Sequence, residues 1–307
     1  MIKKGIILAG GMGTRMSPLT KAVNKHLLPI YDKPLIFYPL SILMLSKIRD
    51  ILIIVNKGQL EQYKKIIPNG NNLGIRITYK EQNKPIGLPD AFILGEKFIG
   101  KSNTALILGD NFFYGQNLTK ILGECCKLSN GAKVLLHRVS KPELYGIAKV
   151  NNKNKITLIK EKPKKFISDL AITGLYFFDN KVIKYAKTLK PSKRSEIEIT
   201  DLLNKYKSKK KLSADYIGRG GAWLDTGSIE DFYKTSAFVS AIENRQGFKI
   251  ACIEEIAFNN KWINKVQIKN SIKFYGNCNY SEYLKIQLYH LPASRQLNHL
   301  NQKNQLR

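Results

Sequence analysis

Glycines crowd the end of the first apolar run of the chain, and two cations follow them. The run 5–10 leads into the segment 10–15, which reads Gly-Gly-Met-Gly-Thr-Arg, and Lys25 follows Arg15 by ten residues. Glycines after a strand let backbone N–H groups approach a phosphate closely, and nearby cations suit a triphosphate. The dinucleotide fingerprint fails because Met16 stands where a third glycine is required, and no Gly-Lys-Ser/Thr closes a P-loop. Since a plain tight turn would use the same glycines, the motif alone leaves both interpretations open.

Two carboxylates follow short apolar runs in widely separated parts of the chain. Asp110 comes after the run 106–109, and Asp225 comes after the run 222–224. A carboxylate at the carboxyl end of a buried strand is a usual Mg²⁺ ligand, because Mg²⁺ takes few carboxylates and keeps waters and phosphates. For any single such Asp, capping of the next turn is the commoner role. Two carboxylates from distant strands could bind one metal ion, but the sequence does not show that they meet.

Alternating charge marks residues 160–163, which read Lys-Glu-Lys-Pro at the end of a predicted strand. Such a pattern usually belongs to a solvated face. The functional alternative is that Lys162 binds a phosphate while Glu161 accepts hydrogen bonds from sugar hydroxyls. Considered alone, the motif favours the solvated face.

Strands and helices alternate over about the first 140 residues, which predicts a doubly wound, mostly parallel α/β sheet. Right-handed crossovers would place the loops that follow the strands at one edge, where ligands bind. Later strands have fewer helices between them and are expected to extend the sheet and build a second lobe. The predicted strands are 5–10, 50–56, 75–82, 104–110, 133–139, 155–161, 171–178, 212–217 and 222–224. The predicted helices are 34–47, 59–67, 88–98, 118–127 and 231–245.

Net charge is the unusual feature of the composition. The 307 residues include 51 Lys+Arg and 23 Asp+Glu, a formal charge of +28, while the hydrophobic share of 43% excludes a disordered or fibrous chain. Such an excess usually indicates nucleic acid or an anionic membrane. However, Lys supplies 42 of the 51 basic residues, so A/T-rich codon usage could produce the charge without such a partner. We find no nucleic-acid motif, and the basic cluster 207–211 is expected to be a solvated loop.

The cysteines and the apolar runs exclude other classes of protein. None of the four cysteines forms a C-x-x-C pair, which argues against zinc ribbons and thioredoxin-type sites. With no signal peptide recognised, free thiols predict a reducing cytoplasm. The longest apolar run, 35–45, is too short for a bilayer, which needs roughly 20 residues. We therefore expect a buried helix there and no membrane partner.

Taken together and in order, the motifs resemble the sugar-1-phosphate nucleotidylyltransferases, and within that family the members that use dTTP and glucose 1-phosphate. The resemblance covers about residues 2–285. It implies a Rossmann-like nucleotidyltransferase sheet with an inserted sugar-binding lobe and a C-terminal helical segment. The segments that carry it are 10–15, 25–29, 31–34, 109–111, 113–115, 145–146, 161–163, 173–176, 196–201 and 223–227.

The same resemblance implies a division of the chain. Residues 1–230 would form the catalytic domain, with a nucleotide-binding part over about 1–110 and a sugar-binding part over about 111–230. Residues 231–291 would form a C-terminal segment that makes a homotetramer and a second, regulatory nucleotide site. Residues 292–307 would be a polar tail.

The implied reaction is attack by the phosphate oxygen of glucose 1-phosphate on the α-phosphorus of dTTP, which gives dTDP-glucose and pyrophosphate, the first step of dTDP-rhamnose-type sugar synthesis. By resemblance, Arg15 would hold the triphosphate, and Lys25 would contact phosphates near the α position. Lys162 would hold the sugar phosphate, and Asp110 and Asp225 would hold Mg²⁺. No general base is needed, because the attacking oxygen is already ionised at neutral pH. Open alternatives are uridylyl transfer, another sugar phosphate, or a regulatory homologue that only binds nucleotide sugars.

The resemblance also assigns binding residues. A Gln82 amide complements the N3–H and carbonyl of thymine but also of uracil, and the methyl that separates them gives only about 1–3 kcal/mol. Trp223 would support the metal-binding loop. The nucleotide positions are Leu8, Gly10, Gly11, Gly13, Thr14, Arg15, Lys25, Gln82 and Gly87. The sugar positions are Asn111, Tyr145, Gly146, Glu161, Lys162, Ile172 and Thr173. The chain departs from the family pattern at Met16, His26, Ile86 and Pro89.

Overall fold

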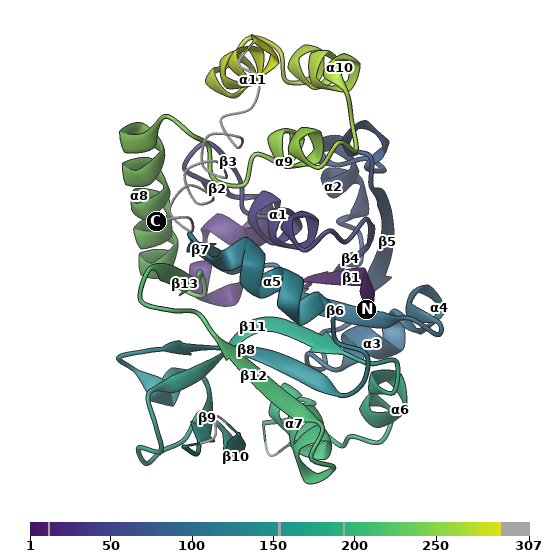
Figure 1. Ribbon diagram of the computed structural model, residues 1–307, viewed down its shortest axis with the longest axis vertical. Helices are drawn as coiled ribbons and strands as arrows, with labels where there is room; N and C mark the ends of the chain where they lie inside the picture. Colours follow the sequence, from purple (N-terminus) through teal and green to yellow (C-terminus); the bar gives the residue numbers. More distant parts are fainter. Residues whose placement is uncertain (12, 153–154, 193, 290–307) are drawn as a thin grey trace, which may run out of the picture.

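A mixed nine-stranded sheet forms the centre of the molecule (Figure 1), in a computed structural model that describes residues 1–11, 13–152, 155–192 and 194–289. Four strands at one side of the sheet are parallel, in the order β6-β1-β4-β5. They are β1 (Ile2–Ala9), β4 (Asp50–Asn56), β5 (Arg76–Gln82) and β6 (Asn103–Leu108). The chain moves outward from β1 to β4 and β5 and then returns to the other side of β1. This is the predicted doubly wound arrangement.

The direction of the sheet changes at β11, which pairs antiparallel with β6, β8 and β9. Strand β12 then pairs parallel with β8, and β10 pairs antiparallel with β9. The later strands therefore extend the sheet, as predicted, and make the lower part of the molecule in Figure 1. These strands are β8 (Ala132–Arg138), β9 (Gly146–Val150), β10 (Ile156–Glu161), β11 (Leu170–Phe178) and β12 (Leu212–Tyr216).

Helices cover both faces of the sheet, because neighbouring residues of its strands point into different cores. On β1, Ile7 faces a core shared with Leu43 and Leu122, whereas Ile6 faces a core shared with Phe92 and Leu202. The first core is covered by α1 (Phe37–Leu45), α2 (Leu60–Ile66) and α5 (Leu118–Cys126). The second is covered by α3 (Asp90–Leu94), α4 (Glu96–Ile99), α6 (Val182–Ala186) and α7 (Ile199–Ser208).

Two sequence predictions need correction. The helix expected over 88–98 is two short helices that meet at Gly95, a residue with low helix propensity. The basic cluster expected to be a loop is partly helical, because α7 continues to Ser208 and includes Lys207. Lys207 Nζ donates to the Thr157 carbonyl at 3.2 Å, so the start of the cluster packs on the sheet.

Short elements complete this part of the fold, and of their strands only β13 was predicted, as the run 222–224. Strand β7 (Asn111–Gly115) pairs antiparallel with β13 (Gly221–Asp225), and β2 (Pro29–Ile30) pairs with β3 (Lys33–Pro34). Single 3₁₀ turns occur at η1 (Thr14–Met16), η2 (Leu19–Lys21), η3 (Lys25–Leu27), η4 (Asn71–Leu73) and η5 (Pro142–Leu144).

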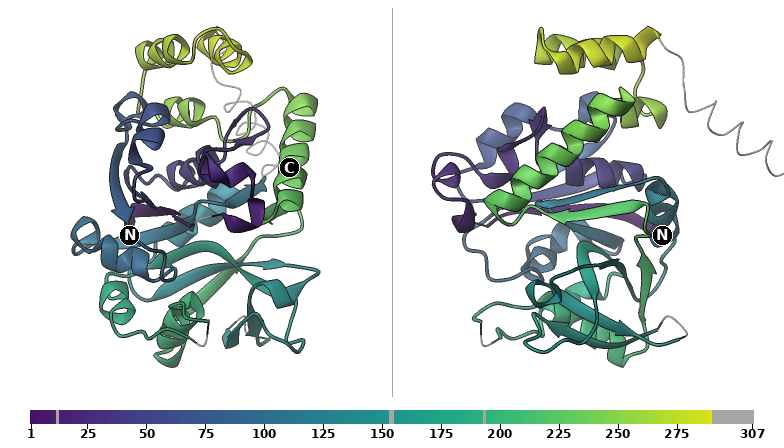
Figure 2. Two further views of the ribbon diagram at one scale, coloured as in Figure 1. Left: turned by 180° about the vertical axis from the view of Figure 1, so that it is seen from behind. Right: turned by 90° about the vertical axis from the view of Figure 1, so that its left-hand side faces the viewer.

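Four helices follow β13 at the C-terminal end of the described chain. Helix α8 (Ile229–Gln246) begins where the Ser228 side chain accepts from the Asp231 N–H, and it runs along one side of the sheet (Figure 2). Helices α9 (Ile253–Asn259), α10 (Lys265–Tyr275) and α11 (Asn279–Tyr289) stack at the end of the molecule farthest from β9 and β10. The polar tail proposed for 292–307 lies outside the described residues.

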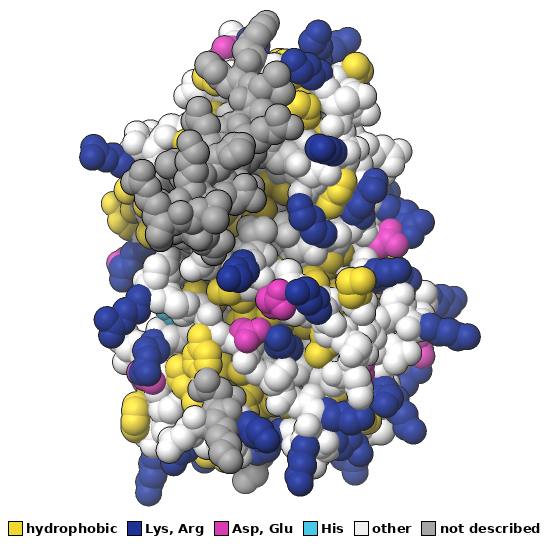
Figure 3. All heavy atoms as spheres, in the orientation of Figure 1, with side chains coloured by type: hydrophobic (Ala, Val, Ile, Leu, Met, Phe, Trp, Pro, Cys, Tyr) yellow, Lys and Arg dark blue, Asp and Glu magenta, His cyan; other side chains and the backbone are white. Residues whose placement is uncertain are grey.

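Lys and Arg side chains are spread over the face shown in Figure 3 rather than gathered into one stripe. Among the described helices, none has both the length and the apolar character needed to cross a bilayer.

Candidate active site

Polar residues from four parallel strands meet at one edge of the sheet. Gly10 follows β1, Asn56 ends β4, Gln82 ends β5, and Asp110 stands two residues beyond β6. These ends are level, because Leu8 on β1 is in register with Ile54 on β4 and Leu108 on β6, and Asn56 is in register with Gln82. The strand β1 lies where the chain changes direction across the sheet, which is the usual position of a ligand site in such folds.

The side chain of Asn56 anchors the glycine loop after β1. The Gly11 N–H donates to Asn56 Oδ1 at 3.0 Å, and Asn56 Nδ2 donates to the Gly11 carbonyl at 2.9 Å. Gly11 (φ 101°) and Gly13 (φ 57°) both have positive φ, which glycine adopts without strain. The glycine loop is therefore anchored to the end of β4. Sequence reasoning missed Asn56, whose only signal was a polar residue at the end of an apolar run.

The predicted base-binding residues lie beside this loop. A Cβ atom on Gly10 would stand 1.7 Å from Gln82 Nε2, so the glutamine amide packs directly on the glycine backbone. Gln82 Nε2 donates to Asn56 Oδ1 at 3.2 Å, which orients the amide. Gly87 (φ 130°) bridges to Ile197, whose N–H donates to the Ile86 carbonyl at 2.8 Å.

Lys25 and Asp110 form the central contact of the site. Lys25 Nζ lies 2.5 Å from Asp110 Oδ2, and both groups are largely buried. Asn111 Nδ2 donates to the other carboxylate oxygen at 3.0 Å. Burial acts to raise the pKa of Asp110, but Lys25, His26 and the hydrogen bonds outweigh it and lower that pKa to about 2. Asp110 is therefore a permanent anion at neutral pH.

Pairing of β13 with β7 brings the second predicted metal ligand to the same place. Asp225 is in register with Asn111, and Thr226 donates to the Asp110 carbonyl through its N–H (3.0 Å) and its hydroxyl (2.8 Å). Burial, and next the charge of Asp110, raise the pKa of Asp225 to about 7. Two neighbouring buried carboxylates, one of which resists ionisation, favour a cation between them.

The donor set fits a magnesium ion better than a structural metal. Among the residues that the structure describes, no three His, Cys, Asp or Glu side chains are grouped so that they could hold a metal. Asp110 and Asp225 would supply two carboxylates, which leaves the remaining positions to phosphate oxygens and waters, as Mg²⁺ requires.

Arg15 lies beside Asp225. A Cβ atom on Gly227 would lie 3.0 Å from Arg15 Nη2, so the guanidinium rests on the backbone that follows Asp225. Its charge lowers the pKa of Asp225, against the larger effects of burial and Asp110. The structure thus brings Arg15 to the carboxylate pair. Thr14, next to it, is exposed in η1.

Asn111 and Trp223 support one another inside the site. Asn111 Oδ1 accepts from Trp223 Nε1 at 2.6 Å and from the Gly174 N–H at 3.0 Å. The Trp223 ring lies 5.1 Å from the Tyr145 ring, between centroids. The Asn111 acceptor is therefore already used by the protein, so a contact from Asn111 to a sugar would come from its amide nitrogen.

The predicted sugar-binding residues converge where β9, β10 and β11 meet. A Cβ atom on Gly146 would lie 3.0 Å from Glu161 Oε2, so the glycine gives this carboxylate room. Thr173 Oγ1 is buried and has no hydrogen-bond partner in the described part of the chain. Lys162 is exposed with φ 40°, and its N–H donates to the Tyr145 carbonyl at 3.0 Å. The Ile172 side chain packs into the second core, so only its backbone can reach a ligand.

Sequence reasoning missed a cation in this region. Arg194 Nη1 lies 3.6 Å from Glu161 Oε1 and 3.5 Å from Glu198 Oε1. Burial, followed by the charge of Glu198, raises the pKa of Glu161, while Lys162 and Arg194 oppose that rise. Arg194 precedes the segment 196–201 that carried part of the family resemblance, and it is one of only nine arginines.

His26, which departs from the family pattern beside Lys25, lies beneath the site. Its Nδ1 is 2.7 Å from Asn24 Oδ1, and a Cβ atom on Gly109 would stand 2.7 Å from its Cδ2. Burial and the Lys25 charge lower the pKa of His26 to about 3. The imidazole is therefore neutral and packs under the Asp110 loop. Among the other departures, Met16 is fully buried, Ile86 is 39% exposed, and Pro89 precedes α3.

Comparisons with known proteins agree with this geometry. The family model described as "Nucleotidyl transferase" matches residues 4–242. A glucose-1-phosphate thymidylyltransferase from Neisseria meningitidis is 46% identical over 281 residues, which cover 92% of this chain and 98% of the relative. A solved glucose-1-phosphate thymidylyltransferase from Bacillus anthracis, in complex with sucrose, has a TM-score of 0.71 and 40% identity and covers 76% of this chain and 94% of its own. A UDP-glucose pyrophosphorylase complexed with UDP-glucose has a TM-score of 0.69 and 27% identity. The match covers 80% of this chain and 100% of the pyrophosphorylase chain.

The raised pKa of Asp225 makes stability depend on pH. In the metal-free folded protein this carboxyl titrates near 7, against an ordinary value of 3.8 in the unfolded chain. Between these values the folded state holds a proton that the unfolded state has lost. The stabilising contribution is therefore complete below about pH 3.8 and is lost as the pH rises through 7.

We predict that Asp225→Asn raises the Tm of the metal-free protein, because the neutral amide removes the loss of folding stability that the Asp225 carboxyl causes as the pH rises. The Tm difference from wild type should grow from about pH 4, where it is near zero, to a few degrees at about pH 8, measured by calorimetry in chelator. Glu143→Gln, which removes an exposed carboxylate from the same lobe, serves as the control. Identical Tm values for wild type and Asp225→Asn at pH 8 would contradict the raised pKa.

Proposed function

Because the chain belongs to the nucleotidyl transferase family, we propose that it transfers the thymidylyl group of dTTP to glucose 1-phosphate, forming dTDP-glucose and pyrophosphate. The observation that carries this proposal is the 46% identical relative, matched over 92% of the chain. The charged residues expected of such an enzyme are all present around one edge of the sheet and its neighbouring lobe. This activity would begin dTDP-rhamnose-type sugar synthesis.

The protein's main task in this reaction is positioning and charge compensation. A phosphate oxygen of glucose 1-phosphate attacks the α-phosphorus in line with the departing pyrophosphate. Arg15 and the glycine loop would hold the triphosphate, and Lys25 would contact its α-phosphate. Mg²⁺, bound by Asp110 and Asp225, would offset the repulsion between the two anionic reactants. The attacking oxygen needs no general base, and the neutral, buried His26 is not required as one.

The orientation of Gln82 supports recognition of thymine or uracil. Its amide nitrogen is used by Asn56, so the carbonyl oxygen is the end that can accept a hydrogen bond from a base. Thymine and uracil present an N3–H donor there, whereas the N3 atom of cytosine is an acceptor. The 27% identical UDP-glucose pyrophosphorylase makes uridylyl transfer the second candidate, since this contact does not distinguish the two bases.

The sugar phosphate is proposed to bind between β10 and the segment before α7. Lys162 and Arg194 supply two cations for its phosphate, and Glu161 with the buried Thr173 hydroxyl can bond to sugar hydroxyls. The intact charged residues argue against a purely regulatory homologue. We further propose a homotetramer formed through residues 231–291, in the cytoplasm, and small-molecule partners rather than nucleic acid.

The direct test is pyrophosphate release over a grid of the four common deoxynucleoside triphosphates and UTP with several sugar 1-phosphates, with and without Mg²⁺. The proposal expects the highest kcat/KM for dTTP with glucose 1-phosphate, and activity only with the divalent ion. A higher kcat/KM for UTP would favour the second candidate. The absence of turnover with every pair would refute the enzyme assignment.

We predict that Asp110→Asn lowers kcat by on the order of 10²–10³, because the change removes both a metal ligand and the ionic partner of Lys25. Steady-state pyrophosphate release at saturating Mg²⁺ measures the effect. Asp215→Asn, which removes a carboxylate paired with Lys133 outside the site, should retain turnover. Near-normal kcat in Asp110→Asn would remove Asp110 from the reaction centre.

We predict that Arg194→Ala raises the KM for glucose 1-phosphate about tenfold and leaves the KM for dTTP unchanged. A lost charge-assisted hydrogen bond to phosphate corresponds to roughly that factor. Initial rates with each substrate varied in turn separate the two constants. Arg76→Ala, at the opposite end of the parallel strands and paired with Asp50, is the matched control. An equal rise in both KM values would mean that Arg194 acts on the site as a whole.

A further inference from the structure

The hairpin that follows Lys25 is too short to be stable without contacts to the rest of the protein. Its strands β2 and β3 have two residues each, and such a short isolated hairpin has little stability in water. Lys25 stands at its open end, where the Leu35 N–H donates to the Leu28 carbonyl (3.0 Å) and the Ile36 N–H donates to the His26 carbonyl (2.8 Å). The Asn24 side chain, which accepts from the His26 N–H (2.9 Å) and from the Tyr63 hydroxyl (2.9 Å), holds the chain before Lys25, and the position of the chain after Lys25 depends on what holds the hairpin.

A small apolar cluster holds one side of the hairpin. It joins Ile30 and Leu35 of the hairpin to Tyr38 on α1, Phe112 on β7 and Val239 on α8. The cluster fixes the distance between the hairpin and α8. Apolar contacts are not directional, so it leaves the rotation of the hairpin tip less determined.

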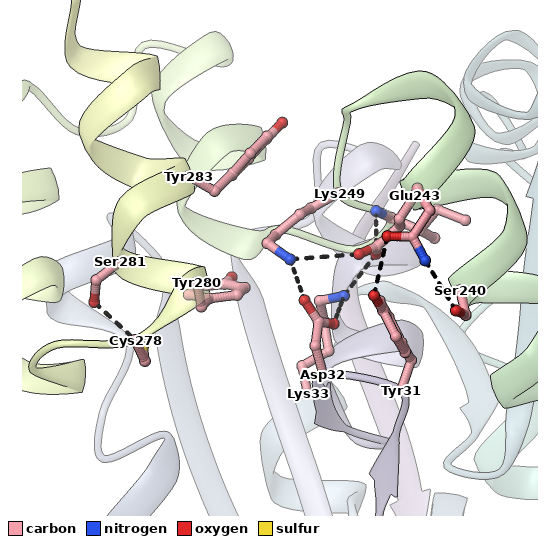
Figure 4. A network of polar contacts seen from close by, with 12 residues as sticks. Tyr31, Asp32, Lys33, Ser240, Glu243, Lys249, Cys278, Tyr280, Ser281 and Tyr283 are labelled. Atoms are coloured by element: carbon pink, nitrogen blue, oxygen red, sulfur yellow. Dashed lines mark hydrogen bonds and ion pairs between the residues drawn. The ribbon is translucent and has the colours of Figure 1, made fainter.

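Four charged side chains orient the tip of the hairpin (Figure 4). Lys33 Nζ contacts Asp32 and lies 2.8 Å from Glu243 Oε1, while Lys249 Nζ contacts Asp32 and lies 3.4 Å from Glu243 Oε2. Glu243 Oε1 also accepts from the Ile250 N–H at 2.8 Å. Two cations and two anions thus form a closed, neutral set between the hairpin tip, the end of α8 and the segment after it.

Because these four charged groups are largely buried, the ion pairs tolerate little change in their geometry. Lys33 is 3% exposed and Glu243 is 6% exposed. Buried ion pairs add little net stability relative to apolar residues of similar volume, because desolvation offsets their attraction, but removal of one partner is costly. Their best supported role is to specify one arrangement among several. The Tyr31 N–H adds a further directional contact by donating to Ser236 Oγ on α8 at 2.9 Å.

The network also connects the site to the C-terminal segment. The matched family model ends at residue 242, so Glu243 and Lys249 lie beyond it. Lys249 Nζ in turn lies 5.8 Å from the ring centroids of both Tyr280 and Tyr283 on α11. The C-terminal segment is therefore in electrostatic contact with the hairpin that follows Lys25.

We propose that Lys33 and Glu243 are positioning residues for Lys25: their buried ion pair orients the hairpin 26–36 on α8 and so places the Lys25 ammonium against the triphosphate. The proposal rests on the proposed function for the triphosphate, but the anchoring of the hairpin can be tested without turnover. Neither residue contacts the expected substrates, so each acts only through Lys25.

The test uses Lys33→Met combined with Glu243→Gln. This double variant leaves the net charge of the network at zero, keeps the Asp32–Lys249 pair, and retains an acceptor for the Ile250 N–H. The expected result is a KM for dTTP raised about tenfold with the KM for glucose 1-phosphate unchanged. In a Lys25→Ala background the same double change should have no further effect, because its consequence passes through Lys25.

Hydrogen exchange supplies the independent measurement. Backbone amides of residues 26–36 in the full chain should exchange at least about tenfold faster in the double variant, while those of β1 and β4 stay unchanged. Lys133→Met combined with Asp215→Asn, which removes a partly buried pair elsewhere, should leave hairpin exchange and both KM values unchanged. If the main variant does not fold, Lys33→Arg keeps the charge, alters its geometry, and should give the same pattern with smaller factors.

Three outcomes would overturn the proposal. One is unchanged exchange of the hairpin in a folded variant, and another is a full additional effect in the Lys25→Ala background. The third is a lower kcat with both KM values unchanged, which indicates only a smaller folded fraction. If wild-type protein turned over no substrate pair, the proposed function would fail, whereas hairpin exchange would still decide whether the network anchors this element.

Discussion

The site depends on the burial of two carboxylates at one edge of a sheet. Burial, and next the charge of Asp110, raise the pKa of Asp225 to about 7, and Lys25 Nζ contacts Asp110 at 2.5 Å. Such an arrangement costs desolvation free energy and is repelled internally unless cations compensate it. A divalent cation would compensate these two carboxylates and could also bind phosphate oxygens.

Positioning of these charges relies on short elements around the sheet rather than on the sheet alone. The β7–β13 pair aligns Asp225 with Asn111, and Thr226 bonds to the Asp110 carbonyl. The Lys25 hairpin shares an apolar cluster with β7 and α8. The same small cluster thus packs against the hairpin, β7 and β13, and the Asp32–Lys249 contact connects the hairpin to the C-terminal segment.

In the folded molecule, the high positive charge does not indicate a nucleic-acid partner as the composition first suggested. The cations with proposed roles, Arg15, Lys25, Lys162 and Arg194, gather at the carboxyl edge of the sheet and in the neighbouring lobe. Many other Lys and Arg side chains are spread over the face shown in Figure 3. A broadly positive surface can raise the association rate of anionic substrates at low salt without selecting among them. Under the proposed function, recognition would depend on a few oriented groups, such as the Gln82 amide, which donates to Asn56.

The sequence by itself determined the alternation of strands and helices, the glycine loop, and the charged residues at strand ends, because each is encoded in a local pattern of a few residues. It also supported the family resemblance. Only the tertiary structure decided that Asp225 lies beside Asp110 and that Asn56 anchors the glycine loop. It also decided that Arg194 contacts Glu161 and that Lys33 pairs with Glu243, 210 residues away in the chain. Those contacts join segments far apart in the chain, and no local propensity specifies them; packing of the two cores and the third cluster brings them together.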